Sequence, residues 1–226
     1  MENENRNAVI VFTRYPFLGK VKTRLAAETN DEFAHSFYKT CAEHTFSELD
    51  ISNEHKFDIY IFVSEGNELD QIKYWTENKF SYCTQEGNNL GERMLNAFKK
   101  IYSMNYEKVI IIGTDAPDIS GDLMLRAFTI LDKNDCVIGP ANDGGYYLLG
   151  FSEKVIDLFS GINWSTASVF DKTIERITQH RVNYSLLEEL IDIDTITDLK
   201  KWHSKFKGDK NHPIQLFVWE NKSHLL

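Results

Sequence analysis

Short apolar runs that alternate with amphipathic stretches constrain this sequence more than any other feature. Residues 8–12 have the length and composition of a strand that is buried on both faces, residues 57–63 are a second strand candidate, and residues 109–112 are the most hydrophobic one. Residues 31–50 and 90–102 carry apolar side chains at helical spacing between such runs. Because strands that alternate with helices build βαβ units, the pattern predicts an α/β fold with a mostly parallel sheet and helices on both faces.

The same reasoning divides the rest of the chain. We expect Asn30 or Asp31 to cap the first long helix, Asp118 to cap a helix after the third run, and Thr195 with Asp198 to form a capping box. No linker or repeat interrupts the pattern. We therefore expect one domain over residues 1–207 and an extension, residues 208–226, that packs on it, adds an edge strand or contacts a partner. Further expected elements are strands at 136–138 and 146–149 and helices at 69–75, 123–131, 155–159, 167–177 and 195–206.

Composition excludes several classes of protein. Of the 226 residues, 42% are hydrophobic and 26% charged, with 12 Gly and 4 Pro, which excludes disorder and low complexity. The net charge of −9 disfavours nucleic acids and anionic membranes as partners. Three cysteines without CxxC spacing indicate neither a disulfide framework nor a zinc site. No apolar run is long enough for a membrane span and the first seven residues lack a signal-peptide pattern, so we expect a cytoplasmic protein.

A basic segment follows the first predicted strand. Residues 8–27 contain no acid and four cations, which are Arg14, Lys20, Lys22 and Arg24. Ligands of open parallel sheets bind outside the carboxyl ends of the strands, and Arg and Lys side chains suit phosphate oxygens. We expect this segment to bind a polyphosphate, with a solvated loop as the alternative. The absence of Walker A and GxGxxG patterns disfavours P-loop and standard dinucleotide-binding proteins.

Acidic residues near the ends of other strands are candidate metal ligands. Asp115 follows the most apolar run, where a carboxylate can hold a divalent cation that also contacts phosphate; a turn residue is the alternative. Asp192 and Asp194 lie on one side of an extended segment and either complete a metal site or cap the last helix. Asp143 precedes two glycines that permit close approach to a ligand, although an ordinary hairpin turn fits equally well.

Two polar segments are candidate substrate contacts. Residues 85–94 form a polar, glycine-bearing entry to a helix that suits a base or a sugar, or that simply caps the helix. Residues 164–166 either line a pocket or provide a helix cap. The seven histidines are scattered, and no Ser-His-Asp or Cys-His arrangement indicates a nucleophilic hydrolase.

The motifs FTRYPFLGKVKTRL, NNLGERM, IIGTDAPDI, GPANDGGYYLLG, INWST and DIDTITDL resemble, in this order, those of the glycosyltransferase-like selenodomain-associated transferases. They span about residues 8–200. The resemblance implies a GT-A-type, three-layer α/β fold of the nucleotide-diphospho-sugar transferase superfamily. Together with the residue chemistry above, it assigns catalytic roles to Asp115 and Asp143, Mg²⁺ or Mn²⁺ to Asp115 and Asp194, nucleotide or phosphate binding to Arg14, Gly19, Lys20, Lys22, Arg24, Gln85, Asn89 and Arg93, and substrate binding to Gly144, Gly145, Trp164, Ser165 and Thr166.

The resemblance implies glycosyl transfer from a nucleotide sugar to a small acceptor, in which cations stabilise the departing nucleotide diphosphate. The alternative is a nucleotidyltransferase that joins a nucleoside triphosphate to a phosphorylated small molecule. Residues 114–118 offer one well-placed acid where glycosyltransferases of this fold usually show DxD, and the basic segment also resembles triphosphate-binding loops. A non-catalytic nucleotide-binding protein is the alternative from another class. No oligomeric state is predicted.

Overall fold

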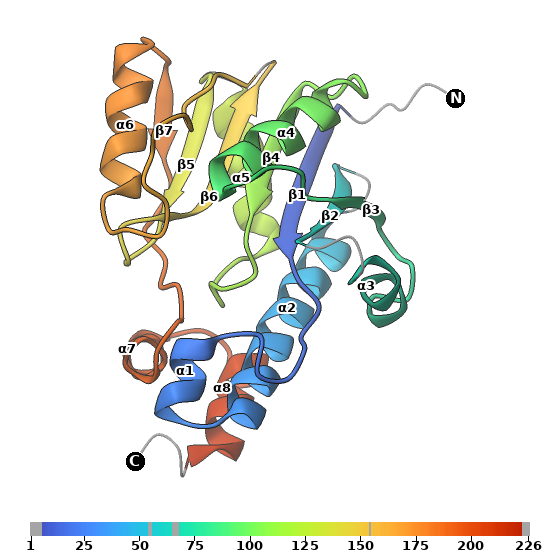
Figure 1. The fold of residues 1–226 in the computed structure, drawn as a ribbon, viewed down its shortest axis with the longest axis vertical. Coiled ribbons are helices and arrows are strands. Elements are labelled where there is room, and N and C mark those ends of the chain that lie inside the picture. Colours follow the sequence, from blue (N-terminus) through green and yellow to red (C-terminus); the bar gives the residue numbers. More distant parts are fainter. Residues whose placement is uncertain (1–5, 54–55, 65–67, 154, 223–226) are drawn as a thin grey trace.

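The computed structural model describes residues 6–53, 56–64, 68–153 and 155–222. Seven strands in this part of the chain form one sheet in the order β3-β2-β1-β4-β6-β5-β7 (Figure 1). Among them only β6 runs antiparallel to its neighbours, β4 and β5. The strands are β1 (Asn7–Thr13), β2 (Asp58–Val63), β3 (Ser81–Thr84), β4 (Lys108–Ile112), β5 (Cys136–Pro140), β6 (Tyr146–Ser152) and β7 (Tyr184–Leu186).

Helices cover both faces of the sheet, which confirms the three-layer α/β fold. Alternate residues of β1 face opposite sides, because side chains of a strand alternate with a period of two. Val9 and Val11 pack in a cluster with α2, α3 and α5, whereas Ala8 and Ile10 pack in another with α4 and α6. The helices of the described residues are α1 (Thr23–Glu28), α2 (Asp31–Asn53), α3 (Leu69–Trp75), α4 (Leu90–Tyr102), α5 (Gly121–Leu131), α6 (Val169–Gln179), α7 (Ile196–Lys205) and α8 (Pro213–Glu220).

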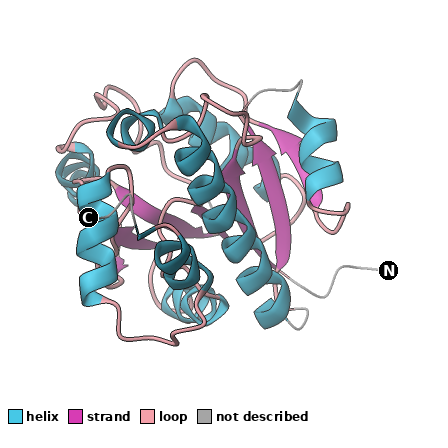
Figure 2. Cartoon of the chain, turned by 90° about the horizontal axis from the view of Figure 1, so that it is seen from below, coloured by secondary structure: helices cyan, strands magenta, loops and turns pink. Residues whose placement is uncertain are grey.

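Several helices lie beyond the carboxyl ends of β1 and β4 (Figures 1 and 2), and their side chains form a third apolar cluster. It joins α1, the first half of α2, α7 and α8 around buried side chains that include Leu25, Phe37, Trp202 and Phe217. Helix α2, with 23 residues, is long enough to contact both the third cluster and the sheet. Its first half packs in the third cluster, and its later residues Ala42 to Leu49 pack on the sheet. We call the helices around this third cluster the lower helices. The carboxyl edge of the sheet therefore faces a second layer of protein rather than open solvent.

Most of the expected elements are confirmed, including the Asn30 cap, whose Oδ1 accepts from Phe33 N at 2.8 Å, and the capping box of Thr195 with Asp198. The expected helix at 155–159 is wrong: this segment is irregular, and its apolar side chains fill the α4 side of the sheet without forming a helix. Asp118 does not cap α5, because Ser120 accepts from Leu123 N instead. The short strands β3 and β7 were not predicted.

The extension at 208–226 adds no edge strand in its described part, which ends at residue 222. It forms α8 (Pro213–Glu220), which packs on α2. The expectation about the N-terminal residues concerns positions 1–7, of which 1–5 lie outside the described residues. None of the described helices combines the length and apolar character needed to cross a bilayer.

Candidate functional site

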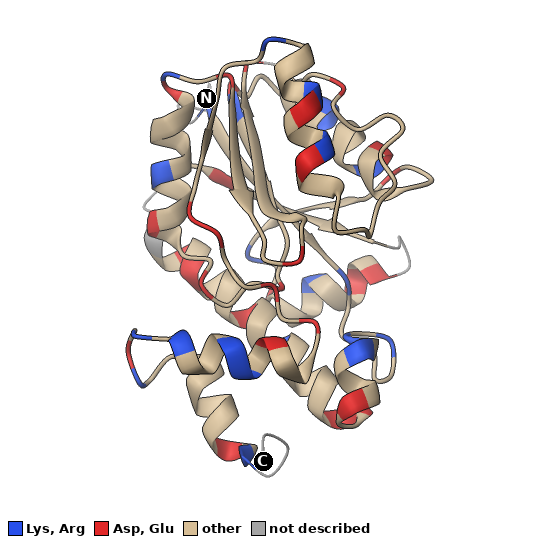
Figure 3. Cartoon of the chain, turned by 90° about the vertical axis from the view of Figure 1, so that its left-hand side faces the viewer, with Lys and Arg blue, Asp and Glu red and all other residues tan. Residues whose placement is uncertain are grey.

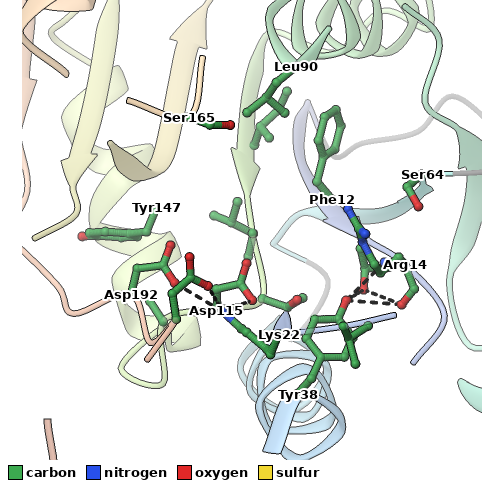
Figure 4. A pocket seen from close by; sticks show the side chains of 18 of the residues that line it. Phe12, Arg14, Lys22, Tyr38, Ser64, Leu90, Asp115, Tyr147, Ser165 and Asp192 are labelled. Carbon is green, nitrogen blue, oxygen red and sulfur yellow. Dashed lines mark hydrogen bonds and ion pairs between the residues drawn. The ribbon is translucent and has the colours of Figure 1, made fainter. Parts of the chain in front are cut away.

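A cavity of about 660 Å³ opens at the carboxyl ends of β1 and β4 (Figure 4). The strand order turns at this point, because β1 continues to β2 on one side and pairs with β4 on the other. Ligands of open α/β sheets bind in such a crevice, and the volume lies within the usual range of small-molecule sites. The cavity is lined from the basic segment, the start of α4, the end of β4, β6 and the segment that precedes α7.

Lys22 lies in the middle of a group of acids on one side of this cavity. Its Nζ is 2.7 Å from Asp115 Oδ1, 2.9 Å from Asp194 Oδ1 and 3.6 Å from Asp192 Oδ1. The Lys22 side chain is only 4% exposed. Burial alone would lower the pKa of Lys22, but the three carboxylates raise it above its ordinary value. The amine is therefore protonated. One ammonium faces three carboxyl groups, so acids outnumber bases in this group of four side chains.

Two local features of the backbone bring these four side chains together. Lys22 is the N-cap of α1 and has left-handed φ and ψ of 45° and 48°, a conformation that costs a non-glycine residue about 1 kcal/mol. The Ile193 amide donates to the Asp115 carbonyl oxygen at 3.2 Å, which places Asp192 and Asp194 beside the end of β4. Acidic loop segments accordingly gather between the sheet and the lower helices (Figure 3). Backbone strain at a cavity wall is typical of functional sites.

Asp192 is the most buried of the three acids. Burial, with Asp115 nearby, raises the pKa of Asp192 to about 7. Its Oδ1 is a buried acceptor without a hydrogen-bond partner in the described part of the chain. Buried polar atoms are rarely left without a partner in native proteins. Its nearest cation is the Lys22 ammonium, at 3.6 Å.

The acidic group fits a hard divalent cation that is shared with a ligand. Within the described ranges, no three Asp, Glu, His or Cys side chains are placed to hold a metal ion by themselves. Mg²⁺ needs only one or two carboxylates when phosphate oxygens and water complete its shell. The Asp115 and Asp194 side chains are 41% and 45% exposed and line the cavity, so their oxygens remain accessible beside Lys22.

Cations from the basic segment and from α4 also line the cavity. Arg24 approaches Asp194 at 3.6 Å yet remains 73% exposed, so its guanidinium is available to a ligand. Arg93 donates from Nε to the Gly87 carbonyl oxygen at 3.1 Å, which holds this side chain at the start of α4. Arg14 and Lys20 complete the set. Lys22, by contrast, lies at the cavity with its ammonium directed to carboxylates (Figure 4).

The structure separates the predicted site residues into two groups. Those that line the cavity are Arg14, Lys20, Lys22, Arg24, Gln85, Arg93, Asp115, Ser165 and Asp194. Those that do not line it are Gly19, Asn89, Asp143, Gly144, Gly145, Trp164 and Thr166. Two members of the second group have evident structural roles: Asn89 caps α4, and Asp143 accepts from the Gly145 amide at 2.8 Å.

The predicted substrate segments 143–145 and 164–166 are nevertheless neighbours. Gly144 has φ of +88°, and a Cβ at this position would lie 2.2 Å from the carbonyl oxygen of Ala167. The Gly144 carbonyl oxygen accepts from the Phe170 amide at 2.8 Å. The glycine thus lets the two segments pack together at the cavity margin, and Ser165 reaches the cavity with a left-handed φ of 62°.

Sequence reasoning missed several cavity residues, among them Phe12, Tyr38, Ser64 and Tyr147. Phe12 and Tyr147 belong to apolar strand runs, and Tyr38 lies on the buried face of α2. Their side chains follow the pattern of core residues, so periodicity alone could not distinguish them. Position at a strand end was the available signal for Phe12 and Ser64.

Comparisons with known proteins agree with the predicted fold. The model of the family described as "Uncharacterized protein conserved in bacteria (DUF2064)" matches residues 48–166. None of the curated proteins compared with this chain matches it. A crystal structure of a proposed nucleotide-diphospho-sugar transferase from Desulfovibrio desulfuricans G20 is similar with a TM-score of 0.91 and 29% identity, and 98% of this chain and 97% of that chain are covered.

Two more distant structures share the fold. A cytidylyltransferase from Leptospira borgpetersenii has a TM-score of 0.56 and 15% identity, with 98% of this chain and 97% of that chain covered. A 4-diphosphocytidyl-2C-methyl-D-erythritol synthase from Anaerococcus prevotii has a TM-score of 0.55 and 14% identity, with 86% and 92% covered. At such identities the likeness concerns the fold, and function has to be argued from the site.

Proposed function

We propose that this chain, which belongs to the family DUF2064, is a metal-dependent transferase. The proposed reaction moves a glycosyl group from a nucleotide sugar to a small acceptor. One observation carries this proposal. Cations from the basic segment and carboxylates from the ends of β4 and of the segment before α7 converge on one cavity. The similar chain from D. desulfuricans, named as a proposed nucleotide-diphospho-sugar transferase, supports the choice of donor.

The accessible cations suit the diphosphate of such a donor. Arg14, Lys20 and Arg24 belong to one segment and present side chains that bind phosphate oxygens in charge-assisted hydrogen bonds. When the sugar leaves, negative charge grows on the departing nucleotide diphosphate, and fixed cations in a cavity stabilise that charge better than water does. These residues therefore bind the donor and stabilise its leaving group.

The acids have a different role. Mg²⁺ or Mn²⁺ held by Asp115 and Asp194 would neutralise charge on the same diphosphate as a Lewis acid. Lys22 keeps these two carboxylates close together before the ligand arrives, because its ammonium contacts both. Asp143 is proposed to act at the acceptor side, because the adjacent Gly144 packs against Ala167, two residues after the cavity-lining Ser165.

Nucleotidyl transfer is the second candidate, and a specific observation favours it. Asp115 is the acid that ends β4, where a DxD pair would provide two, and Arg93 adds a fourth accessible cation to the cavity. Such a cavity can hold a triphosphate, from which pyrophosphate would leave when the phosphate of an acceptor attacks. The distant cytidylyltransferases support this candidate through the fold alone.

Calorimetric titration distinguishes these candidates. The purified protein is titrated with individual nucleotide sugars and individual nucleoside triphosphates, each in the presence of Mg²⁺ or Mn²⁺. We expect one nucleotide sugar to bind more tightly than every triphosphate and to be consumed when acceptors are added. Selective binding of a triphosphate would favour nucleotidyl transfer. Binding without consumption of any donor would favour a non-catalytic nucleotide-binding protein, and no binding would contradict all three.

A further inference from the structure

The Tyr38 hydroxyl lies at the floor of the cavity, in the fork where the chain leaves β1 and β4. Val11 of β1 is paired with Ile112 of β4, so the two strands end side by side and their loops then diverge. Tyr38 extends from α2 into this fork, and its side chain lines the cavity although the residue is only 5% exposed (Figure 4).

This hydroxyl anchors the chain where it leaves β1. Its oxygen is 3.0 Å from Thr13 Oγ1, accepts from the Arg14 amide at 3.2 Å and lies 3.2 Å from the Arg14 carbonyl oxygen. The side chain of Thr114, which precedes Asp115, lines the same cavity. A hydroxyl has one proton and two lone pairs, so Thr13 and Arg14 use its full hydrogen-bonding capacity.

A saturated, buried hydroxyl is unsuited to proton transfer. Burial first, and then the charge of Asp115, raise the pKa of Tyr38 above its ordinary value, so the phenol keeps its proton. Its neighbours Thr13 and Thr114 are themselves 5% and 2% exposed. The network is thus enclosed, and its geometry is set by the protein rather than by a ligand.

We propose that Tyr38 is a positioning residue, whose hydroxyl fixes the start of the basic segment to α2 at the cavity and so orders the phosphate-binding cations before a ligand arrives. The proposal rests on the proposed function for its effect on nucleotide binding. The restraint that Tyr38 places on Arg14 is independent of the proposed function. Preorganised charges bind better because less ordering is left to the binding step.

The variant Tyr38→Phe tests this role, with Tyr102→Phe as the matched control. Tyr102 lies on α4, across the sheet from Tyr38, and donates to the Phe151 carbonyl oxygen at 2.8 Å. Each variant removes one hydrogen-bonded phenol hydroxyl and retains the ring. For both variants and the wild type, the measurements are amide exchange at Arg14, thermal unfolding, and affinity for the nucleotide that binds best in the presence of Mg²⁺.

We expect Tyr38→Phe to speed exchange of the Arg14 amide and to weaken nucleotide affinity by about tenfold, the usual scale for one lost hydrogen bond to an ordered group. Tyr102→Phe should leave both quantities at wild-type values, even if it unfolds at the same temperature as Tyr38→Phe. The proposal is overturned if Arg14 exchanges as in the wild type, or if both variants lose affinity equally. Should the wild type bind no nucleotide, the proposed function fails, and the Arg14 exchange still decides whether Tyr38 restrains the segment.

Discussion

Lys22 Nζ lies 2.7 Å from Asp115 Oδ1, which joins the segment after β1 to the end of β4. Asp194 binds the same ammonium at 2.9 Å, so one buried lysine organises acids from two further segments. The lysine is also where the left-handed backbone turns into α1. The ion pair therefore connects the sheet to the lower helices, and it also lines the cavity.

Replacing Lys22 by Met should destabilise the protein by about 2 kcal/mol. Breaking a fully buried pair costs roughly 3–5 kcal/mol, and we expect less here because Asp115 and Asp194 are more than a third exposed. Urea unfolding measures the difference. Lys20→Met is the control, since Lys20 is an exposed cation of the same segment and should change the free energy of unfolding by less than about 0.5 kcal/mol. Equal stability of the two variants would contradict the role of Lys22.

Asp115→Asn should abolish most of the dependence of nucleotide binding on Mg²⁺. An amide is neutral and a weak ligand for a hard cation, so we expect the Mg²⁺-dependent gain in affinity to fall by at least about tenfold. Titration calorimetry with Mg²⁺, and again with EDTA, measures that gain. Asp122→Asn removes an exposed carboxylate in the first turn of α5 and should keep the wild-type gain. If Asp115→Asn also kept the wild-type gain in affinity with Mg²⁺, the metal would not be bound by this residue.

The His44–His212 pair should lower stability as the pH drops below about 6.5, whereas Asp192, whose pKa is raised to about 7, should act in the opposite direction. The rings of His44 and His212 lie 4.3 Å apart between α2 and α8, and burial lowers the pKa of both below 6.5. His44 lowers the pKa of His212 further, whereas Asp118 and Glu48 oppose the shift. The unfolded chain therefore binds more protons, and the stabilisation present above pH 6.5 is lost as the pH falls toward the lower pKa of the folded state.

The geometry adds a second reason for this pH dependence. His212 Nδ1 accepts from the Ile214 amide at 3.2 Å and caps α8, and a proton on that nitrogen would abolish the cap. We expect the free energy of unfolding of His212→Gln, measured relative to the wild type, to increase as the pH falls from 7.5 to 5.5. His180→Gln, at an exposed position, should leave the slope unchanged. A wild-type slope in the His212 variant would contradict a contribution of this histidine to the pH dependence.

Gly144→Ala should destabilise the protein by about 2–4 kcal/mol. The estimate adds the cost of a left-handed φ to that of overpacking, since the new Cβ would meet the Ala167 carbonyl oxygen at 2.2 Å. Gly113→Ala is the matched control, because a Cβ there has nothing within 4 Å and its φ lies outside the left-handed range. Thermal and urea unfolding compare the two. Similar stability would mean that the contact between the two segments relaxes easily.

Strand ends account for what could be predicted about the site. The apolar runs at β1 and β4 identified parallel strands, and the ends of adjacent parallel strands meet at one edge. The convergence of the basic segment with Asp115 followed from that geometry. The partners of Lys22 could not be predicted in the same way, because Asp192 and Asp194 come from a distant segment whose path depends on the Ile193 amide bonding to Asp115.

Several other elements could not be predicted because their sequences lack a distinctive pattern. β3 and β7 are short and have no fully buried residue, so they lack the apolar run that identified the other strands. The segment at 155–159 has apolar residues, yet Asp157 accepts from the Phe159 and Ser160 amides and turns the chain, which a short pattern cannot reveal. Asp118 has the residue type of a cap, but it accepts from Trp202 Nε1 at 2.9 Å and holds α7 to the loop after β4.

A crystal structure with Mn²⁺ and a nucleotide diphosphate tests the central claim most directly, because anomalous scattering locates the ion independently of the model. The account predicts an anomalous peak about 2 Å from a carboxylate oxygen of Asp115, with the diphosphate between that peak and the side chains of Lys20 and Arg24. A nucleotide bound in the cavity with its phosphates directed away from Asp115, or an ion bound elsewhere, would contradict it.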